Sequence, residues 1–457
     1  MRSLMWFRSD LRIHDNEALY KATQNQQAIA LFIIAHEDWQ KHHDAKLKLA
    51  FMWRNLQVLQ KALDHKNIPL KIIEVDSWAQ IPERINQLML DHQISSLYFN
   101  HEVGINEVER DRAVYRQLKK SGFKINHCHD KTLVKLGSIL NGDNNPYKVF
   151  TAFKKRLIEV LEHQPFENDC EIPVQAPTGL ASDDIQVNPY QAFDDLAYQA
   201  GEDAAFGVLQ DFLKEDIFHY HNHRDMPAID GTSRLSHYLT QGVVSVKALL
   251  REALILNEGH FKTGDEGILT WMNELYWREF YYHIMWNFPN VSKNRAFQEK
   301  TEKIQWRDNE ADFDAWKNGK TGVPIVDAFM RQLKATGWMH NRGRMITAMF
   351  LTKNLLIDWR KGEAWFMQNL IDGDFAANNG GWQWSASTGT DAVPYFRIFN
   401  PVTQSERFDP KGDFIRQWCP ELSHLDHQQI HKVQKNVIVD LKSSRVRAIE
   451  AFKRLSE

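Results

Sequence analysis

Short apolar runs alternate with amphipathic stretches over the first 130 or so residues. Five runs have the length of strands, and they begin near Leu4, Ala28, Leu70, Ile94 and Phe123. The run AIALFIIA, from Ala28, is apolar on both faces, as expected of a strand that helices cover on each side. The pattern therefore predicts an N-terminal doubly wound parallel sheet of five strands with helices between them.

Beyond about Ala200 the apolar positions recur with the 3.6-residue period of helices, and strand-like runs become scarce. Residues 163–189 are richer in Pro, Asp, Gln and Gly and have no sustained period, which is typical of a long, partly ordered linker. We expect an α/β domain over 1–131, an interdomain linker over 132–199 and a helical domain over 200–457. The predicted fold class is α/β plus all-α.

Composition limits the possible functions only weakly. The net charge of −3 does not indicate a nucleic-acid partner for the chain as a whole. Cys128, Cys170 and Cys419 are too few for a disulfide framework or a four-cysteine zinc site, which suits a reducing compartment. The sequence shows no apolar signal region and no run approaching the roughly 18 apolar residues that span a bilayer. We therefore expect a cytoplasmic protein.

Two tryptophans close the segment DGDFAANNGGWQW, from Asp372 to Trp384. Glycine and asparagine pairs beside tryptophan indicate tight backbone bends that hold aromatic planes around a ligand. The alternative is a Gly-rich turn capped by core tryptophans.

The segment WMNELYWREFYYH places Trp271, Glu274, Trp277, Arg278 and Tyr281 on one helical face. Glutamate and arginine rarely join a buried aromatic stripe unless they bind each other or a polar ligand, because unpaired buried charge is costly. The alternative is a core stripe with one internal ion pair.

In GWMHNRGRM, we expect Trp338, Asn341 and Met345 to share a helical face, with Arg342 and Arg344 beside it. An asparagine side chain both donates and accepts hydrogen bonds, which suits the edge of a base or a flavin.

The surrounding stretch, 331–361, holds seven Lys or Arg residues and a single acid, Asp358. This composition predicts a local basic surface that could contact phosphate, and the interleaved Trp338 and Trp359 favour nucleic acid over a merely solvated face.

GTSRLSHYL places Thr232, Ser233 and Ser236 where a helix could begin, and hydroxyls and backbone N–H groups there suit a pyrophosphate, although Thr and Ser are also ordinary N-caps.

Three other motifs do not support sites. Gly319-Lys320-Thr321 lacks the first glycine of a P-loop, since position 314 is Asp, and the first strand has no GxGxxG. Neither His219, His221 and His223 nor His127-Cys128-His129 has the spacing of a zinc site.

Taken together, these motifs resemble the photolyase and cryptochrome family, over nearly the full length from MWFRSDLRIHDNEAL to FIRQWCPEL. The resemblance implies an antenna α/β domain and a helical domain that holds FAD in a folded shape. The implied FAD-binding residues are Tyr220, Thr232, Ser233, Arg234, Leu235, Ser236, Trp271, Arg344, Asp372, Gly373, Asp374 and Asn378. Asn378 would lie at the flavin N5.

Within that family the chain is most similar to class I photolyases, which repair cyclobutane pyrimidine dimers, because of Asn341, Met345 and Trp384. The resemblance implies that Glu274 hydrogen-bonds a flipped-out dimer and that Trp277 and Trp384 stack on it. The implied catalytic set is Glu274, Trp277, Asn341, Met345 and Trp384. The implied DNA-binding set is Arg224, Glu274, Trp277, Arg278, Tyr281, Asn341, Arg342 and Gln404.

The implied reaction is light-driven electron transfer from reduced FAD to the dimer, so the cofactor does the chemistry, and no metal is expected. Trp306, Trp359 and Trp382 match the family's electron-transfer chain, which photoreduces the oxidised flavin; three structural tryptophans are the alternative.

A second, antenna chromophore is also implied. His42, Asn106, Glu107 and Lys293 match the positions that hold 5,10-methenyltetrahydrofolate, which we favour over a deazaflavin. The chain departs from the family at Ala152 and His237, where proline is usual, so local turns there are in question.

Two rival functions are a blue-light receptor that signals to a protein partner, and a light-independent flavin oxidoreductase. The complete dimer-contacting set and the short tail after Pro420 argue against the receptor, and the lack of an NAD fingerprint argues against the oxidoreductase. We expect a monomer that binds dimer-containing DNA, with no membrane and no obligate protein partner.

Overall fold

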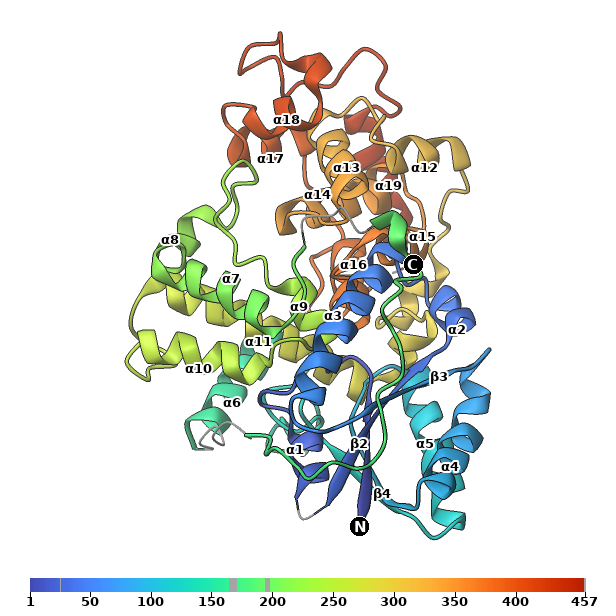
Figure 1. The fold of residues 1–457 in the computed structure, drawn as a ribbon. Coiled ribbons are helices and arrows are strands. Elements are labelled where there is room, and N and C mark those ends of the chain that lie inside the picture. Colours follow the sequence, from blue (N-terminus) through green and yellow to red (C-terminus); the bar gives the residue numbers. More distant parts are fainter. Residues whose placement is uncertain (25, 164–170, 194–197, 456–457) are drawn as a thin grey trace.

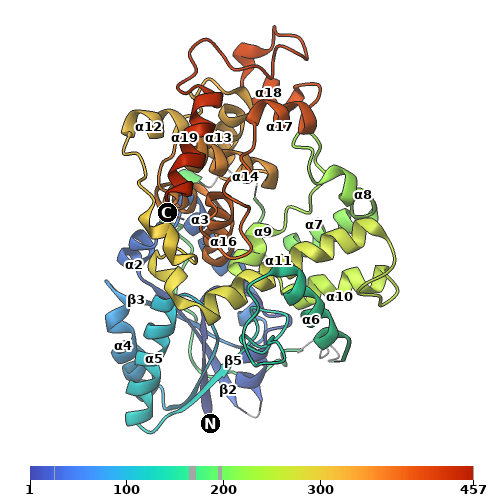
Figure 2. The same cartoon turned by 180° about the vertical axis from the view of Figure 1, so that it is seen from behind.

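The computed structural model of the protein describes residues 1–24, 26–163, 171–193 and 198–455 (Figure 1). A parallel sheet at the N-terminus is followed by a mostly helical remainder, which confirms the predicted fold class. Figure 2 shows the same arrangement from behind, with the sheet below and the C-terminal helices above. Within the described ranges, no helix is long and apolar enough to cross a membrane.

The sheet has five parallel strands in the order β3-β2-β1-β4-β5, and each lies where an apolar run predicts it. The strands are β1 (Arg2–Phe7), β2 (Gln27–Ile34), β3 (Leu70–Glu74), β4 (Ile94–Asn100) and β5 (Lys124–Cys128).

Alternate residues of the central strands enter two separate cores, as a period of two requires. Met5 and Phe7 pack in one cluster with side chains such as Leu19 and Phe51, whereas Leu4 and Trp6 pack in another with side chains of the opposite face. Both faces of the sheet are therefore covered by helices, which explains the continuous apolar run of β2. The helices of this part are α1 (Glu17–Thr23), α2 (His36–Lys41), α3 (Lys46–Asp64), α4 (Ile81–Asp91) and α5 (Ile105–Lys120).

The described part of the predicted linker contains an α-helix, α6 (Phe150–His163), and a short 3-10 helix, Gln191–Phe193. From Glu171 onward the described chain runs in extended form along the sheet and is held by hydrogen bonds. The Gln175 side chain bonds both backbone groups of Ala28, and Arg2 Nη2 donates to the Thr178 carbonyl at 2.8 Å. The rest of the predicted linker, 164–170 and 194–197, lies outside the described residues, as does Cys170.

The helical part comprises α7 to α19 with a π-helical turn, η5. Their bounds are α7 (Glu202–Lys214), α8 (Asp216–His223), α9 (Ser236–Gln241), α10 (Val246–Leu256), α11 (Glu266–Asn287), α12 (Glu310–Lys317), α13 (Pro324–Thr336), α14 (Asn341–Met349), η5 (Phe350–Asn354), α15 (Trp359–Asn369), α16 (Phe375–Ala386), α17 (Pro401–Phe408), α18 (Asp413–Trp418) and α19 (Leu441–Lys453).

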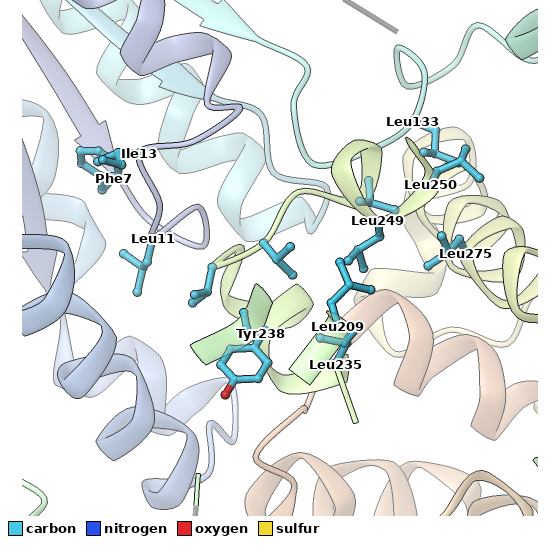
Figure 3. Packing of buried hydrophobic residues seen from close by; sticks show 14 of the residues in the cluster. Phe7, Leu11, Ile13, Leu133, Leu209, Leu235, Tyr238, Leu249, Leu250 and Leu275 are labelled. Atoms are coloured by element: carbon cyan, nitrogen blue, oxygen red, sulfur yellow. The ribbon is translucent and has the colours of Figure 1, made fainter. Parts of the chain in front are cut away.

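One hydrophobic core joins the sheet to the first helices of this part. In Figure 3, Phe7 and Leu11 lie toward the sheet, Tyr238 lies between, and Leu249 and Leu275 lie toward the helices. The buried Arg12 reinforces the junction, because it pairs with Asp130 beside the sheet and donates to the Gly242 carbonyl at 3.0 Å. The two parts are thus held together by both apolar and polar contacts.

Neither departure from the family pattern disturbs the local backbone. Ala152 lies within α6 and His237 within α9, both of which are regular helices. The His237 ring is buried against Phe51 and Tyr198, with centroid distances of 5.1 and 5.0 Å. Burial lowers the pKa of His237 to about 4, so the ring is neutral at physiological pH.

Candidate functional site

A cavity of about 510 Å³, here called the central cavity, lies among helices of the C-terminal part. Its lining comes from helices α8, α9, α10, α11, α14, α15 and α16 and from the segments 232–235, 338–339 and 370–374. Every residue of the predicted FAD set lines it except Gly373, which lies in a second cavity. The predicted catalytic set lines the same cavity; its members are Glu274, Trp277, Asn341, Met345 and Trp384.

Helix α11 contributes the aromatic and charged stripe that its sequence predicts. Trp271, Glu274, Trp277, Arg278 and Tyr281 all line the central cavity. Trp277 is fixed by a parallel stack on Phe150, with a centroid distance of 3.6 Å and an interplanar angle of 9°. Phe150 belongs to α6, so a residue of the predicted linker orients a predicted catalytic residue.

Glu274 does not form an ion pair within its own helix. Its carboxylate accepts a hydrogen bond from Arg224 Nη1 at 2.6 Å, whereas Arg278 Nη1 donates to the Lys131 carbonyl at 2.8 Å. Burial raises the pKa of Glu274, and the charge of Arg224 opposes this rise. The alternative of a core stripe with an internal ion pair is therefore wrong.

The segment 232–235 bends sharply into α9. Arg234 adopts a positive φ of 51°, and its guanidinium lies over the Trp338 ring at 3.7 Å. Helix α9 begins at Ser236 without a side-chain cap, so no Thr or Ser hydroxyl of this motif is used as its N-cap. Thr232, Ser233, Arg234 and Ser236 all line the cavity. Hydroxyl and guanidinium groups are suitable hydrogen-bond partners for a diphosphate.

Opposite this segment, Arg344 is paired with Asp372. Arg344 Nη2 lies 2.7 and 3.0 Å from the two carboxylate oxygens, and Arg344 Nε donates to the Met339 carbonyl at 2.9 Å. Nearby, Asn378 Nδ2 donates to the Glu363 carbonyl at 3.1 Å. Fixed polar groups of this kind, beside apolar lining from residues such as Leu275 and Phe366, suit the edges and the faces of a flat ring system, so the cavity fits FAD.

The Asp374 side chain accepts two hydrogen bonds within the protein. It caps α16 by accepting from the Ala377 N–H at 2.9 Å, and it accepts a hydrogen bond from the Tyr282 hydroxyl. Burial alone would raise the pKa of Asp374, but the charges of Arg278 and Lys131, together with these two hydrogen bonds, outweigh it, and the net pKa is lowered. Asp374 therefore stays ionised at the wall of the cavity.

The Asp372 to Trp384 segment does not bend tightly, contrary to the prediction from its glycine and asparagine pairs. Residues Phe375–Ala386 form a continuous helix, α16. A Cβ atom on Gly380 would lie 2.1 Å from Tyr281 Cδ1, whereas one on Gly381 would meet nothing within 4 Å and would stand in the cavity. The glycines thus allow close helix packing and leave room in the cavity, while the helix keeps its backbone hydrogen bonds.

The second sequence motif also differs in detail. Gly337 ends α13 with φ +68°, and α14 begins only at Asn341 with His340 as its N-cap. Trp338 therefore precedes the helix and does not share a helical face with Asn341 and Met345, although all three line the central cavity.

The predicted basic surface over 331–361 is wrong. Five of its seven cations have carboxylate partners, and Lys353 is fully buried, where it donates to the Ala386 carbonyl and the Ser387 hydroxyl. The carboxylate partners are Glu421 for Arg331, Asp225 for Arg342, Asp372 for Arg344, Glu302 for Arg360 and Asp308 for Lys361. These acids lie outside the segment, so local composition could not reveal them.

The predicted DNA-binding residues divide between the cavity and its surroundings. Arg224, Arg278 and Tyr281 line the central cavity, as do the residues that are also in the catalytic set, but Arg342 and Gln404 do not. Arg342 lies over the Phe408 ring of α17 at 4.2 Å, and Gln404 is on the same helix.

The three tryptophans of the predicted electron-transfer chain share one hydrophobic cluster. Trp382 lines the central cavity, Trp359 is buried, and the half-buried Trp306 packs against the cluster's edge beside Phe452, with a centroid distance of 6.3 Å. A Cβ atom on Gly362 would lie 2.1 Å from Trp382 Cη2, so this glycine leaves space for the indole. The set thus runs from the cavity to a partly exposed position.

A second cavity of about 450 Å³, the interdomain cavity, lies between the sheet and helices α15 and α16. His42, Asn106 and Glu107 line it; Lys293 is absent from the described lining, although Ser292 and Asn294 on either side belong to it. Asn106 Nδ2 and His42 Nε2 are 2.9 Å apart. Burial and the nearby charge of Glu102 raise the pKa of Glu107.

Several residues that shape these sites are in none of the predicted sets. Asp225, Tyr282, Lys131 and Phe150 bind or stack on predicted site residues. Asp225 directly follows Arg224 in sequence, and Tyr282 directly follows Tyr281, so adjacency to a predicted residue was the available signal for these two. Lys131 and Phe150 have no predicted neighbour in sequence. Across the described residues, no group of three or more His, Cys, Asp or Glu side chains could hold a metal ion.

Comparisons with known proteins extend over nearly the whole chain. The family described as "DNA photolyase" matches residues 3–173, and the family described as "FAD binding domain of DNA photolyase" matches residues 271–454. A deoxyribodipyrimidine photo-lyase of Escherichia coli (strain K12) is 42% identical over 98% of both chains.

Two solved structures are similar in fold. A cryptochrome of Synechocystis sp. PCC6803 superposes with a TM-score of 0.85 and 27% identity, covering 98% of this chain and 99% of its own. An archaeal photolyase of Sulfolobus tokodaii, described "with two FAD molecules", gives a TM-score of 0.83 and 27% identity, covering 99% and 100%.

The wall of the interdomain cavity contains a carboxyl group whose protonation depends on folding. Burial raises the pKa of Glu363 from its usual 4.5 to about 7, and a hydrogen bond from Asn379 at 2.8 Å opposes this rise. As pH rises from 4.5 to 7, the unfolded chain therefore binds fewer protons than the folded chain, and stability falls.

Replacing Glu363 by Gln keeps the oxygen that Asn379 binds and is expected to remove this loss of folding stability at higher pH. The urea midpoint of Glu363→Gln should exceed that of the wild type by a margin that grows between about pH 5 and about pH 8. The exposed Glu299→Gln is the control, and equal pH profiles for all three proteins would contradict the assignment.

Proposed function

The chain belongs to the DNA photolyase family, and we propose that it repairs cyclobutane pyrimidine dimers in DNA with FAD in the central cavity. The observation that carries the proposal is the shared wall of that cavity. The five residues of the dimer-contacting set line it together with eleven residues of the FAD set. A relative that is 42% identical over 98% of both chains is a deoxyribodipyrimidine photo-lyase, which favours repair over signalling.

In this proposal, Thr232, Ser233 and Arg234 bind the diphosphate of FAD, while Arg344, Asp372 and Asn378 bind the edges of its flavin. When bound, FAD supplies the light-driven electron that splits the dimer. The chain's own groups orient the reactants and exclude water, which is consistent with the fixed pairing of Arg344 with Asp372 and of Asp374 with Tyr282.

The dimer is proposed to leave the DNA stack and enter the cavity, where Trp277 and Trp384 provide flat apolar surfaces. A damaged pair is poorly stacked, so its extrusion costs less than that of a normal base. Stacking on an aromatic side chain returns about 1–3 kcal/mol per base. Because Trp277 is already stacked on Phe150, little side-chain entropy is lost when the dimer binds.

Glu274 is proposed to hydrogen-bond the dimer, while Asn341 and Met345 complete the pocket around it. Arg224, Arg278, Tyr281, Arg342 and Gln404 are proposed to contact the DNA around the flipped dimer. Arg224 and Arg278 line the cavity, and Arg342 pairs with Asp225, in a protein whose net charge is −3. Such a local arrangement fits phosphate contacts that are confined to one site.

Trp382, Trp359 and Trp306 are proposed to carry electrons from the protein surface to an oxidised cofactor. Indole is the most readily oxidised of the abundant apolar side chains in their cluster. The position of Trp382 at the cavity and the partial exposure of Trp306 support this direction of transfer.

The interdomain cavity is proposed to hold the antenna chromophore, for which 5,10-methenyltetrahydrofolate is our first choice. His42, Asn106 and Glu107 provide donors and acceptors for a polar heterocycle there. A second FAD is the rival occupant, because one similar solved structure is described with two FAD molecules. We further propose that the protein works as a monomer in the cytoplasm without an obligate protein partner.

The function is tested by repair of cyclobutane thymine dimers in duplex DNA by the purified, reduced protein. Absorbance near the band of intact bases should recover under blue or near-UV light and stay constant in the dark. No recovery under light with FAD bound would overturn repair and favour a receptor.

Replacing Glu274 by Ala is expected to weaken binding of dimer-containing DNA while FAD stays bound. A hydrogen bond to a charged group contributes about 1.5–3 kcal/mol, so affinity should fall about tenfold or more, and the repair yield should fall with it. The matched control is Glu266→Ala, an exposed acid in the first turn of the same helix. Repair by Glu274→Ala equal to that of this control would remove Glu274 from the site.

Replacing Trp306 by Phe is expected to slow the photoreduction of oxidised FAD and to spare repair by enzyme that is already reduced. Phenylalanine keeps an aromatic ring beside Phe452 but is much harder to oxidise. Flavin absorbance under illumination measures the first effect, and dimer repair after chemical reduction measures the second. Loss of both would indicate a structural role instead of a relay.

A further inference from the structure

Two arginines and two carboxylates alternate beside the central cavity. Arg224 Nη1 lies 2.6 Å from Glu274, Arg224 Nε lies 3.9 Å from Asp225, and Asp225 lies 2.6 Å from Arg342 Nη2. Arg224 is the C-cap of α8, Asp225 follows it, Glu274 is on α11 and Arg342 is on α14 (Figure 1). The row therefore joins three helices, and Asp225 is the one member that belongs to none of the predicted sets.

Arg224 has a close carboxylate partner and a more distant one. Its side chain is only 21% exposed, so loss of the close partner would leave a poorly hydrated cation. That close partner is Glu274, the group proposed to hydrogen-bond the dimer. When Glu274 turns to the dimer, the only other carboxylate within ion-pair distance of Arg224 in the described chain is that of Asp225.

The Arg342 guanidinium is held in place and has an unsatisfied donor, so it is suited to bind an anion. Its guanidinium is fixed over the Phe408 ring at 4.2 Å, and its Nε atom is buried without a hydrogen-bond partner. The Asp225 oxygen 2.6 Å from Arg342 Nη2 is likewise buried and makes no well-directed hydrogen bond. This is a close charge contact with unsatisfied donors and acceptors, which a DNA phosphate could replace at little cost in hydrogen bonds.

Asp225 thus stands between a residue proposed to bind the dimer and a residue proposed to bind phosphate. In DNA without a dimer, Glu274 keeps Arg224, and a phosphate must displace Asp225 from Arg342. With a flipped dimer, Glu274 is recruited and Arg224 Nη1 becomes available to the DNA. Arg224 Nε lies 3.9 Å from Asp225, so this carboxylate can pair with that side of the guanidinium as it gives up Arg342 to the phosphate.

We infer that Asp225 is a specificity-determining positioning residue, which passes from Arg342 to Arg224 when a dimer engages Glu274. The inference rests on the proposed function, since it requires Glu274 to bind the dimer and Arg342 to bind DNA. The Asp225 carboxylate weakens binding of undamaged DNA, because a phosphate must displace it from Arg342. In the dimer complex it pairs with Arg224 instead. Asp225 therefore increases the ratio of the affinity for dimer-containing DNA to the affinity for undamaged DNA.

The test is the affinity ratio of three variants for duplexes with and without one thymine dimer, measured with the FAD-containing protein in the dark at one salt concentration. In Asp225→Asn the ratio of dimer to undamaged affinity should fall about fivefold, the size of a roughly 1 kcal/mol ion-pair effect. Asp216→Asn removes the same charge from the other end of α8, at an exposed position, and should leave the ratio as in the wild type. Asp225→Glu restores the charge and should recover most of the ratio.

The outcomes separate the inference from the proposed function. Equal ratios for Asp225→Asn and Asp216→Asn would overturn the role of Asp225, as would a fall in the ratio that Asp225→Glu does not reverse. If Asp225 were only structural, Asp225→Asn would lower the flavin content, which is measured by absorbance. The protein that still folds would then keep the wild-type ratio of dimer to undamaged affinity. A wild-type protein that does not prefer the dimer duplex and does not repair it in light would overturn the proposed function, and this inference with it.

Discussion

The position of the central cavity depends on how helix α11 is tied to the chain that leaves the sheet. The Glu279 carboxylate is completely buried and accepts hydrogen bonds from the N–H groups of Leu133 and Val134, at 2.8 and 3.2 Å. One residue earlier, Arg278 donates to the Lys131 carbonyl. A buried carboxylate is tolerated only when such donors compensate its lost hydration, so this contact has essentially one geometry. The same helix carries Glu274 and Trp277, and its attachment to the sheet therefore sets where the cavity wall stands.

Much of this architecture follows from periodicity alone. Strands β1 and β2 were predictable because both of their faces are buried, which leaves uninterrupted apolar runs in the sequence, whereas β3 and β5 are partly exposed and left shorter runs. The stripe on α11 was predictable because Glu and Arg at helical spacing among aromatic residues are costly unless they meet polar groups. In both cases the signal is local, and the tertiary structure satisfies it without changing the backbone that the local sequence favours.

The remaining features depend on contacts between residues far apart in sequence. Glu274 is paired with Arg224, fifty positions away, and no spacing rule connects them. The acids that neutralise the segment 331–361 come from other helices and loops, so its composition gave a basic surface that does not exist. The glycines of α16 were misinterpreted as turn residues because the sequence does not show that Tyr281 packs against Gly380. Close approach between helices and a sharp turn both require glycine, and only the fold distinguishes them.

Thr240 and Asp374 line both the central cavity and the interdomain cavity, so these two residues form a common partition. A molecule bound on either side meets a carboxylate whose other contacts, to Tyr282 and the Ala377 N–H, are already fixed. By equilibrium linkage, any coupling between the two bound molecules is reciprocal. If the first changes the affinity of the second by some factor, the second changes the affinity of the first by the same factor. The order in which the chain is loaded can alter the pathway of assembly, but the free energy of the doubly loaded protein is the same by either route.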